Sequence, residues 1–259
     1  MKKEIPILDN FCDDMPFLTA ESWLAQDEDL QRVAAAVKKY KIKTAVFTWG
    51  NEAKKLVEVL STCDLTDTSP TGTLYTYKKR VLIYILNIGA PNAAAAVEEL
   101  RVCGIKNFIA FGSAGNIRLD IDESNIIIVD RAIRDEGTSY HYAPPALYSY
   151  PDESFTKKLI AFLSEKDIRH TVGTAWSTDA FYRETKGRIA KRISQGCLAV
   201  DMECSALASV CKFHNLRFCE FLYFSDAVKQ DSWVRSGEDY RHGIKLRMLK
   251  LALEFADTL

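Results

Sequence analysis

The segment AVDMECSALASV, residues 199–210, places two acids directly before an apolar run. Asp201 and Glu203 flank Met202, and the small and apolar residues that follow resemble a helix ready to be buried. Charged side chains are seldom buried unless a partner stabilises them. The pattern therefore predicts that these acids are paired, either with an internal hydrogen-bonding partner or with a bound ligand.

Several apolar runs of strand character end in small or polar residues, and helical patterns alternate with them. We expect strands over residues 44–50, 79–86, 106–112, 123–133, 169–178 and 216–226, and helices from about residue 27, after residue 89, near residues 153–168, up to about residue 213 and at the C-terminus. This alternation predicts an α/β fold with a sheet covered on both faces. Ligands of such folds gather at the carboxyl ends of strands, which here are Gly50, residues 87–89, 112–115, 178–182, 201–203 and 225–226.

Two of these strand ends could bind an anion. In FGSAGN, residues 111–116, we expect a turn whose backbone N–H groups, with the Ser113 hydroxyl, could cradle a negative charge. A tight structural turn explains the same residues, because Gly and Ser are common in turns. Gly50 ends a second strand, and Lys54 follows one turn into a helical pattern, where a surface lysine is equally ordinary.

Two further strand ends carry groups that could act on a planar ligand. Phe181 and Tyr182 lie beside small polar residues, so an aromatic ring could stack on a ligand there or pack into the core. Asp226 follows an apolar strand, which is a usual place for a helix N-cap. It is also a place where a general acid could act.

The composition is that of an ordinary globular protein. The chain has 259 residues, 47% hydrophobic and 27% charged, with a formal net charge of −1. That balance gives no basis for binding nucleic acid or a membrane surface. No apolar run reaches the ~18–20 residues that span a bilayer, and the first residues lack a stretch of signal-peptide length, so we expect a cytoplasmic protein.

The seven cysteines are scattered and show no C-x-x-C pair. A disulfide framework or a zinc site would need closer, paired spacing. We therefore expect most of them to be reduced core residues, and we expect no metal site.

The order of these motifs resembles the nucleoside phosphorylase superfamily, which contains purine nucleoside phosphorylase, uridine phosphorylase and methylthioadenosine nucleosidase. NIGAPNAAAAVEEL is similar to the family's G-x-G-x-P turn and helix, FGSAGNI to its phosphate and ribose loop, and AVDMECSAL to its ribose motif. The resemblance covers residues 44–228, and residues 1–43 match least well. It implies one domain over residues 1–259, with a three-layer α/β/α fold and a central mixed, partly barrel-like sheet.

The resemblance also implies roles for individual residues. Met202 and Glu203 would hold the ribose, with Glu203 accepting hydrogen bonds from the 2′- and 3′-hydroxyls. Ser113 would contact both ribose and phosphate. Residues 50–54 are similar to the family's G-D-P-x-R phosphate loop, so Gly50 and Lys54 would bind inorganic phosphate.

For the base, the Ser225-Asp226 pair is similar to that of the purine-specific branches, in which the Asp donates to purine N7. The residues implied around the base are Thr178, Phe181, Arg183 and Gly115. The uridine branch uses a Gln and an Arg shortly after the same Phe-Tyr pair. This chain has Arg183 and Arg188 there but no Gln. Purine is therefore favoured, and a uridine phosphorylase is the alternative.

Departures from the family pattern concern the second substrate. Ala110 stands where hexameric phosphorylases have an Arg, Lys54 replaces the loop Arg, and no Arg lies near Asp67, where a neighbouring subunit usually donates one. Phosphorolysis is the leading hypothesis. Hydrolysis by water, with Glu4 or Glu21 as candidates to hold that water, and binding without turnover are the alternatives. The resemblance implies a homo-oligomer, a dimer or a hexamer, and no organic cofactor.

Overall fold

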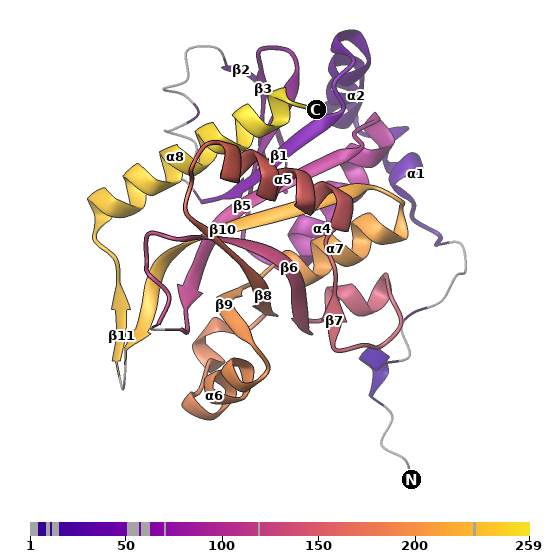
Figure 1. The fold of residues 1–259 in the computed structure, drawn as a ribbon. Coiled ribbons are helices and arrows are strands. Elements are labelled where there is room, and N and C mark those ends of the chain that lie inside the picture. The colour runs from indigo at the N-terminus through magenta and orange to yellow at the C-terminus, as the bar shows by residue number, and fades with distance from the viewer. Residues whose placement is uncertain are drawn as a thin grey trace.

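The computed structural model describes residues 5–8, 11, 16–50, 57, 63–69, 71–118, 120–229 and 232–259, with the side chains of residues 63–69 and 228–229 left out (Figure 1). The strands are β1 Thr44–Trp49, β2 Cys63–Ser69, β3 Gly72–Tyr77, β4 Val81–Leu86, β5 Asn107–Asn116, β6 Ile126–Asp135, β7 Tyr148–Ser149, β8 His170–Thr178, β9 Cys197–Asp201, β10 Arg217–Lys229 and β11 Ser232–Arg235. The helices are η1 Pro6–Leu8, α1 Ala20–Leu24, α2 Glu28–Tyr40, α4 Ala90–Cys103, η2 Thr138–His141, α5 Glu153–Glu165, η3 Phe181–Arg183, α6 Lys186–Ser194, α7 Cys204–Phe213 and α8 Glu238–Asp257.

The sheet is mixed, and part of it closes on itself. Strands β10, β6, β8 and β9 follow one another in the sheet, β9 pairs with β5, and β5 pairs back with β10. These five strands therefore form a closed barrel. From β5 the sheet continues outward through β1, β4, β3 and β2. The predicted mixed, partly barrel-like sheet is confirmed.

Helices cover both faces of the sheet. Alternate residues of β1 point to opposite faces, so Phe47 packs in a core with α2, α4 and α7, whereas Val46 packs in a second core with α5 and α8. Figure 1 shows α5 and α8 on one side of the strands and α4 and α7 on the other. The predicted three-layer α/β/α arrangement is confirmed.

The helix boundaries follow from capping residues. Asp27 accepts a hydrogen bond from the Leu30 amide at 2.8 Å where α2 begins, and Asp152 does the same for Phe155 at 2.7 Å where α5 begins. Helix α4 ends at Gly104, whose φ of +107° suits a residue without a side chain. The starts of α2 and α5 lie close to the positions that the sequence predicts.

Two of the expected strands continue past the ends that the sequence predicts. We expected residues 111–116 to form a turn after a strand, but β5 runs through Asn116 without a break. We expected the last strand to end at Asp226, but β10 continues to Lys229 and forms a hairpin with β11. The small residues of β5 serve a close approach of strands rather than a turn, because β9 and β10 both pair with the end of β5.

The described cysteine side chains are all free and buried, namely Cys103, Cys197, Cys204, Cys211 and Cys219. This confirms the expectation for these five; Cys12 and the Cys63 side chain lie outside the described residues. Among the helices of the described chain, none combines the length and the apolar character needed to cross a membrane.

Candidate active site

Asp201, the first acid of the DMEC motif, ends β9 and caps the start of helix α7. One of its carboxylate oxygens accepts hydrogen bonds from the amides of Glu203, at 2.9 Å, and Cys204, at 2.6 Å. The other oxygen accepts from the Ser177 hydroxyl at 2.7 Å. The first oxygen thereby accepts from two amides that the start of a helix leaves unpaired. Asp201 is thus paired with internal hydrogen-bond donors, which is one of the two alternatives that the sequence predicted for these acids.

Glu203, the second acid, joins two helix N-termini. Its Oε1 atom accepts a hydrogen bond from the Gly89 amide at 2.7 Å. Gly89 precedes α4 with a φ of +118°, and Glu203 precedes α7. Burial, reinforced by the nearby Asp201 carboxylate, raises the pKa of Glu203 to about 8. The motif therefore presents a buried carboxyl group that is largely protonated at neutral pH while the site is empty.

Glu220 adds a third buried acid that the sequence-based interpretation missed. It lies on β10, is 1% exposed, and its Oε2 atom has no hydrogen-bond partner among the described residues. Burial, with the charges of Asp201 and Glu203, raises its pKa well above the usual range. Its register partner on β5 is Ala110. The sequence feature that could have revealed Glu220 is a single acid inside the apolar run RFCEFLYF.

Gly115 brings the DMEC segment and Asp226 to one place. On β5, Gly115 is the register partner of Val200 on β9 and of Asp226 on β10. A Cβ on Gly115 would lie 2.8 Å from Val200 Cγ1 and 3.3 Å from Asp226 Oδ2. Only glycine allows such an approach without a shift of its neighbours.

Asp226 is held by two donors. The Ser225 hydroxyl donates to Oδ1 at 2.7 Å, and the Trp233 indole donates to Oδ2 at 2.8 Å. Trp233 lies on β11, so the hairpin that the sequence did not predict also orients this carboxylate. The N-cap alternative for Asp226 is wrong, because the residue lies inside a strand.

Glu184 is a second acid near Asp226, and sequence reasoning missed it as well. It lies just after η3 and is half-buried. Burial and the charge of Asp226 raise the pKa of Glu184 to about 7, while Arg188 opposes that shift. Glu184 thus lies near enough to Asp226 to be influenced by its charge, and its own charge changes near neutral pH.

The aromatic pair of the TDAFY segment is exposed rather than packed in the core. Phe181 is 50% exposed and Tyr182 is 89% exposed, with ring centroids 4.0 Å apart. Thr178 is buried at the end of β8, and its hydroxyl accepts from the Ala180 amide at 3.4 Å. Arg183 is exposed. The core-packing alternative for Phe181 is therefore wrong, and its ring is accessible to a ligand.

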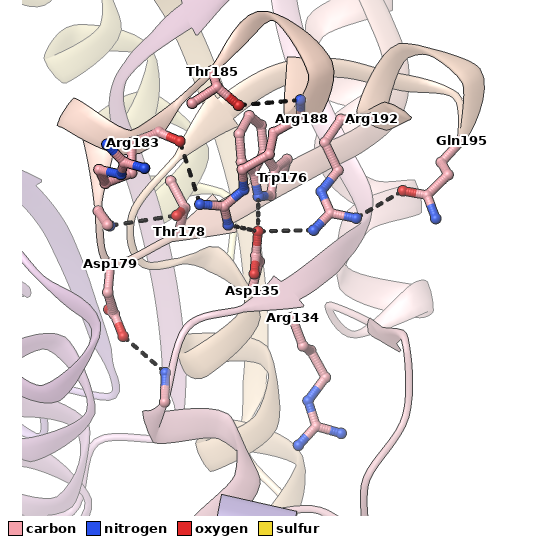
Figure 2. A network of polar contacts seen from close by, with 12 residues as sticks. Arg134, Asp135, Trp176, Thr178, Asp179, Arg183, Thr185, Arg188, Arg192 and Gln195 are labelled. Carbon is pink, nitrogen blue, oxygen red and sulfur yellow. Dashed lines mark hydrogen bonds and ion pairs between the residues drawn. The ribbon is translucent and has the colours of Figure 1, made fainter. Parts of the chain in front are cut away.

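A network around Asp135 fixes this segment to the barrel, as Figure 2 shows. One Asp135 oxygen accepts from the Trp176 indole at 2.8 Å, from Arg192 at 2.8 Å and from Arg188. Burial opposes ionisation of Asp135, but these hydrogen bonds outweigh it and hold its pKa below the usual value. Arg188 also donates to the Arg183 carbonyl at 3.3 Å, so the network positions η3.

Two of the residues implied for phosphate lie just after β1 and within β5. Gly50 follows β1 with a φ of +89°, and Ser113 is exposed on β5. Trp49 connects the two strands, since a Cβ on Gly112 would lie 3.2 Å from its ring. Lys54 and the rest of the loop lie outside the described residues, as does Glu4. Glu21 pairs with Arg101 at 2.7 Å on α4.

Comparison with known proteins agrees with the resemblance. The profile of the Phosphorylase superfamily matches residues 45–246, so the chain belongs to that superfamily. The DeoD-type purine nucleoside phosphorylase of Bacillus cereus is 30% identical over 189 residues, which cover 70% of this chain and 77% of that protein. The guanosine phosphorylase of Halorubrum lacusprofundi is 30% identical over 130 residues, 50% of this chain and 54% of that one. The chain thus spans about half the length of that relative.

Among solved structures, the uridine phosphorylase of Vibrio fischeri has a TM-score of 0.68 and 27% sequence identity, covering 84% of this chain and 92% of that one. The relatives therefore include proteins named for purine, guanosine and uridine substrates.

Proposed function

We propose that this protein cleaves the N-glycosidic bond of a purine ribonucleoside with inorganic phosphate as acceptor, releasing the free base and ribose 1-phosphate. One observation carries the proposal. Gly115 pairs with Asp226 on one side and with Val200, three residues before Glu203, on the other. The end of β5 thereby lies between the segment that carries Glu203, which is suited to bind ribose, and Asp226, which is suited to act on the base.

Glu203 holds the ribose in this mechanism. A carboxylate accepts hydrogen bonds from two adjacent hydroxyls, and those bonds are strong where water is excluded. Because donors stabilise the charged form, nucleoside binding lowers the pKa of Glu203 from its value of about 8 in the empty site. The ring gains positive charge as the base departs, and the ionised carboxylate stabilises that charge.

Asp226 and the aromatic pair act on the base. The Ser225 and Trp233 donors fix the orientation of the Asp226 carboxyl group. As electrons move into the departing purine, this group acts as the general acid and donates its proton to N7. Phe181 is free to stack on the ring. Thr178, Gly115 and Arg183 complete the base site in this proposal, and Gly115 lets Val200 and Asp226 approach because it has no side chain.

Inorganic phosphate binds at Gly50, Ser113 and Lys54 in this proposal. Hydrolysis is a second candidate, because Ala110 is fully buried and brings no cation to β5. In that case water replaces phosphate as acceptor. A homo-oligomer is part of the proposal too, since the Ile88 side chain, next to Gly89, is 66% exposed and a second copy could cover it.

The test is release of free base from inosine, guanosine, adenosine, methylthioadenosine and uridine, each with and without phosphate. The proposal expects release from purine nucleosides only when phosphate is present. Release without phosphate would replace it by hydrolysis, and preference for uridine would overturn the choice of base. Tight nucleoside binding without any release would mean a binding protein that has lost catalysis.

A further inference from the structure

Lys245 lies on α8, 196 residues after Trp49 in the sequence, yet it reaches the candidate phosphate turn. Its neighbours Ile244, Met248 and Leu249 pack into the core between α8 and the sheet, and Lys245 itself is only 8% exposed. Lysine is among the residues least often buried, because removing an ammonium group from water is costly. Lys245 therefore places its ammonium group inside the protein, between α8 and the sheet.

The position of its ammonium group is fixed by the end of β1. Nζ donates a hydrogen bond to the Trp49 carbonyl at 3.2 Å. A Cβ on Gly50 would lie 3.7 Å from the same Nζ atom. Gly50 has a φ of +89°, so the chain turns at the point where the ammonium group arrives. The positive charge thus touches the turn itself rather than the helix on which Lys245 lies.

The turn also adjoins the exposed hydroxyl on β5. The Trp49 ring contacts Gly112 closely, since a Cβ there would lie 3.2 Å from two ring carbons. Ser113 follows Gly112 and is exposed. Three elements, α8, β1 and β5, therefore bring an ammonium group, a glycine turn and a hydroxyl to one region. A cation, accessible backbone and a hydroxyl donor are the groups that bind an oxyanion.

We propose that Lys245 supplies positive charge to an anion subsite at the Gly50 turn, and that the anion is inorganic phosphate. The inference rests on the proposed function for the identity of the anion. It also addresses the departures in the sequence, because Ala110 on β5 provides no cation. An ammonium group binds phosphate as a point charge, without the paired contacts of arginine. Lys245 would therefore set phosphate affinity and leave nucleoside binding largely unaffected.

The test compares phosphate affinity in three proteins by equilibrium dialysis with radiolabelled phosphate. Lys245→Gln keeps a donor for the Trp49 carbonyl and removes the charge, so the phosphate Kd should rise about tenfold or more. Lys245→Arg keeps the charge and should stay within about threefold of the unmodified protein. Lys250→Gln, an exposed lysine on the same helix, is the matched control and should change nothing.

Nucleoside binding and turnover separate this inference from the proposed function. The KM for phosphate should rise in Lys245→Gln while the KM for the nucleoside stays within about threefold. Phosphorolysis with an unchanged phosphate KM in Lys245→Gln would overturn the role of Lys245 and leave the function intact. If phosphate binding depends on Lys245 but the protein releases base without phosphate, the role of Lys245 stands and the proposed phosphorolysis is overturned. A phosphate Kd equal in the Gln variant and the unmodified protein overturns the inference in either case.

A thermal melt accompanies each variant. Should Lys245→Gln fail to fold, the unmodified protein decides the matter through reductive methylation of its lysines, read by mass spectrometry with and without phosphate. Protection of Lys245 by phosphate, with Lys250 unprotected, supports the subsite. Equal methylation of Lys245 in both conditions overturns it.

Discussion

The Glu203 carboxyl group accepts a hydrogen bond from the Gly89 amide at 2.7 Å, across 114 residues of sequence. The contact ties the N-terminus of α7 to that of α4, and both helices pack on the same face of the sheet. A buried acid therefore lies where a positive φ lets the chain turn into α4. Because hydrogen-bond donors favour the ionised carboxylate, its protonation state depends on what occupies the site.

Nucleoside binding should release protons at neutral pH. Because burial raises the pKa of Glu203 to about 8 in the empty site, the group is largely protonated at pH ~7, and ribose hydroxyls favour the ionised form. Calorimetric titration with a purine nucleoside, without phosphate, should give enthalpies that depend on the ionisation enthalpy of the buffer. Glu203→Gln should bind more weakly and lose the buffer dependence. A buffer dependence equal in both proteins would contradict this assignment.

Glu203 should also make stability depend on pH. Its pKa in the folded protein, about 8, lies above the value of 4.5 for an unperturbed glutamate, so the unfolded chain loses this proton first. The folded state therefore loses stability as pH rises from about 4.5 to about 8. Glu203→Gln should show a higher Tm than the unmodified protein near pH 8, and the two curves should converge below pH ~4.5. Glu165→Gln, on the exposed end of α5, is the control and should change neither curve.

Asp226→Asn should reduce kcat/KM by different factors for substrates with different leaving groups. Loss of a general acid costs about 100-fold or more in rate where the departing base needs a proton. We expect kcat/KM for inosine to fall by that order, and a riboside with an activated leaving group to lose far less. Asp239→Asn, an exposed acid on α8, should leave both substrates unaffected. Equal losses on both substrates would show that Asp226 acts on something other than the leaving group.

Gly115→Ala should disrupt the site through one methyl group. That Cβ would lie 2.8 Å from Val200 Cγ1 and 3.3 Å from Asp226 Oδ2, so β5, β9 and the catalytic candidate must shift. We expect kcat/KM to fall by about tenfold or more and the free energy of unfolding to fall by ~1–3 kcal/mol. Gly187→Ala in α6, where a Cβ meets nothing within 4 Å, should keep activity and stability. Similar behaviour of the two variants would show that the strand end tolerates a side chain.

Local patterns predicted much of this protein. Helix α7, and the capped starts of α2 and α5, follow from apolar periodicity and from acids placed before a helix. The DMEC acids also pointed correctly to buried groups with partners.

Pairing between strands that are distant in the sequence could not be predicted from local patterns. The FGSAGN segment has the composition of a turn, yet it forms a strand because β9 and β10 close the barrel against it. The β10–β11 hairpin brings Trp233 to Asp226, and the register of β10 on β5 places Glu220 beside Ala110. The packing of α8 on β1 brings Lys245 to Trp49. None of these contacts leaves a periodic signal in the sequence.

Phosphorus NMR of a single reaction tests the central claim most directly. Inosine and inorganic phosphate are incubated with the protein, and hypoxanthine is measured in the same sample. The account predicts a sugar phosphate signal that grows in step with free hypoxanthine as inorganic phosphate declines. Hypoxanthine that accumulates while the phosphate signal stays constant would contradict phosphorolysis, and inosine that stays intact would contradict its role as the substrate.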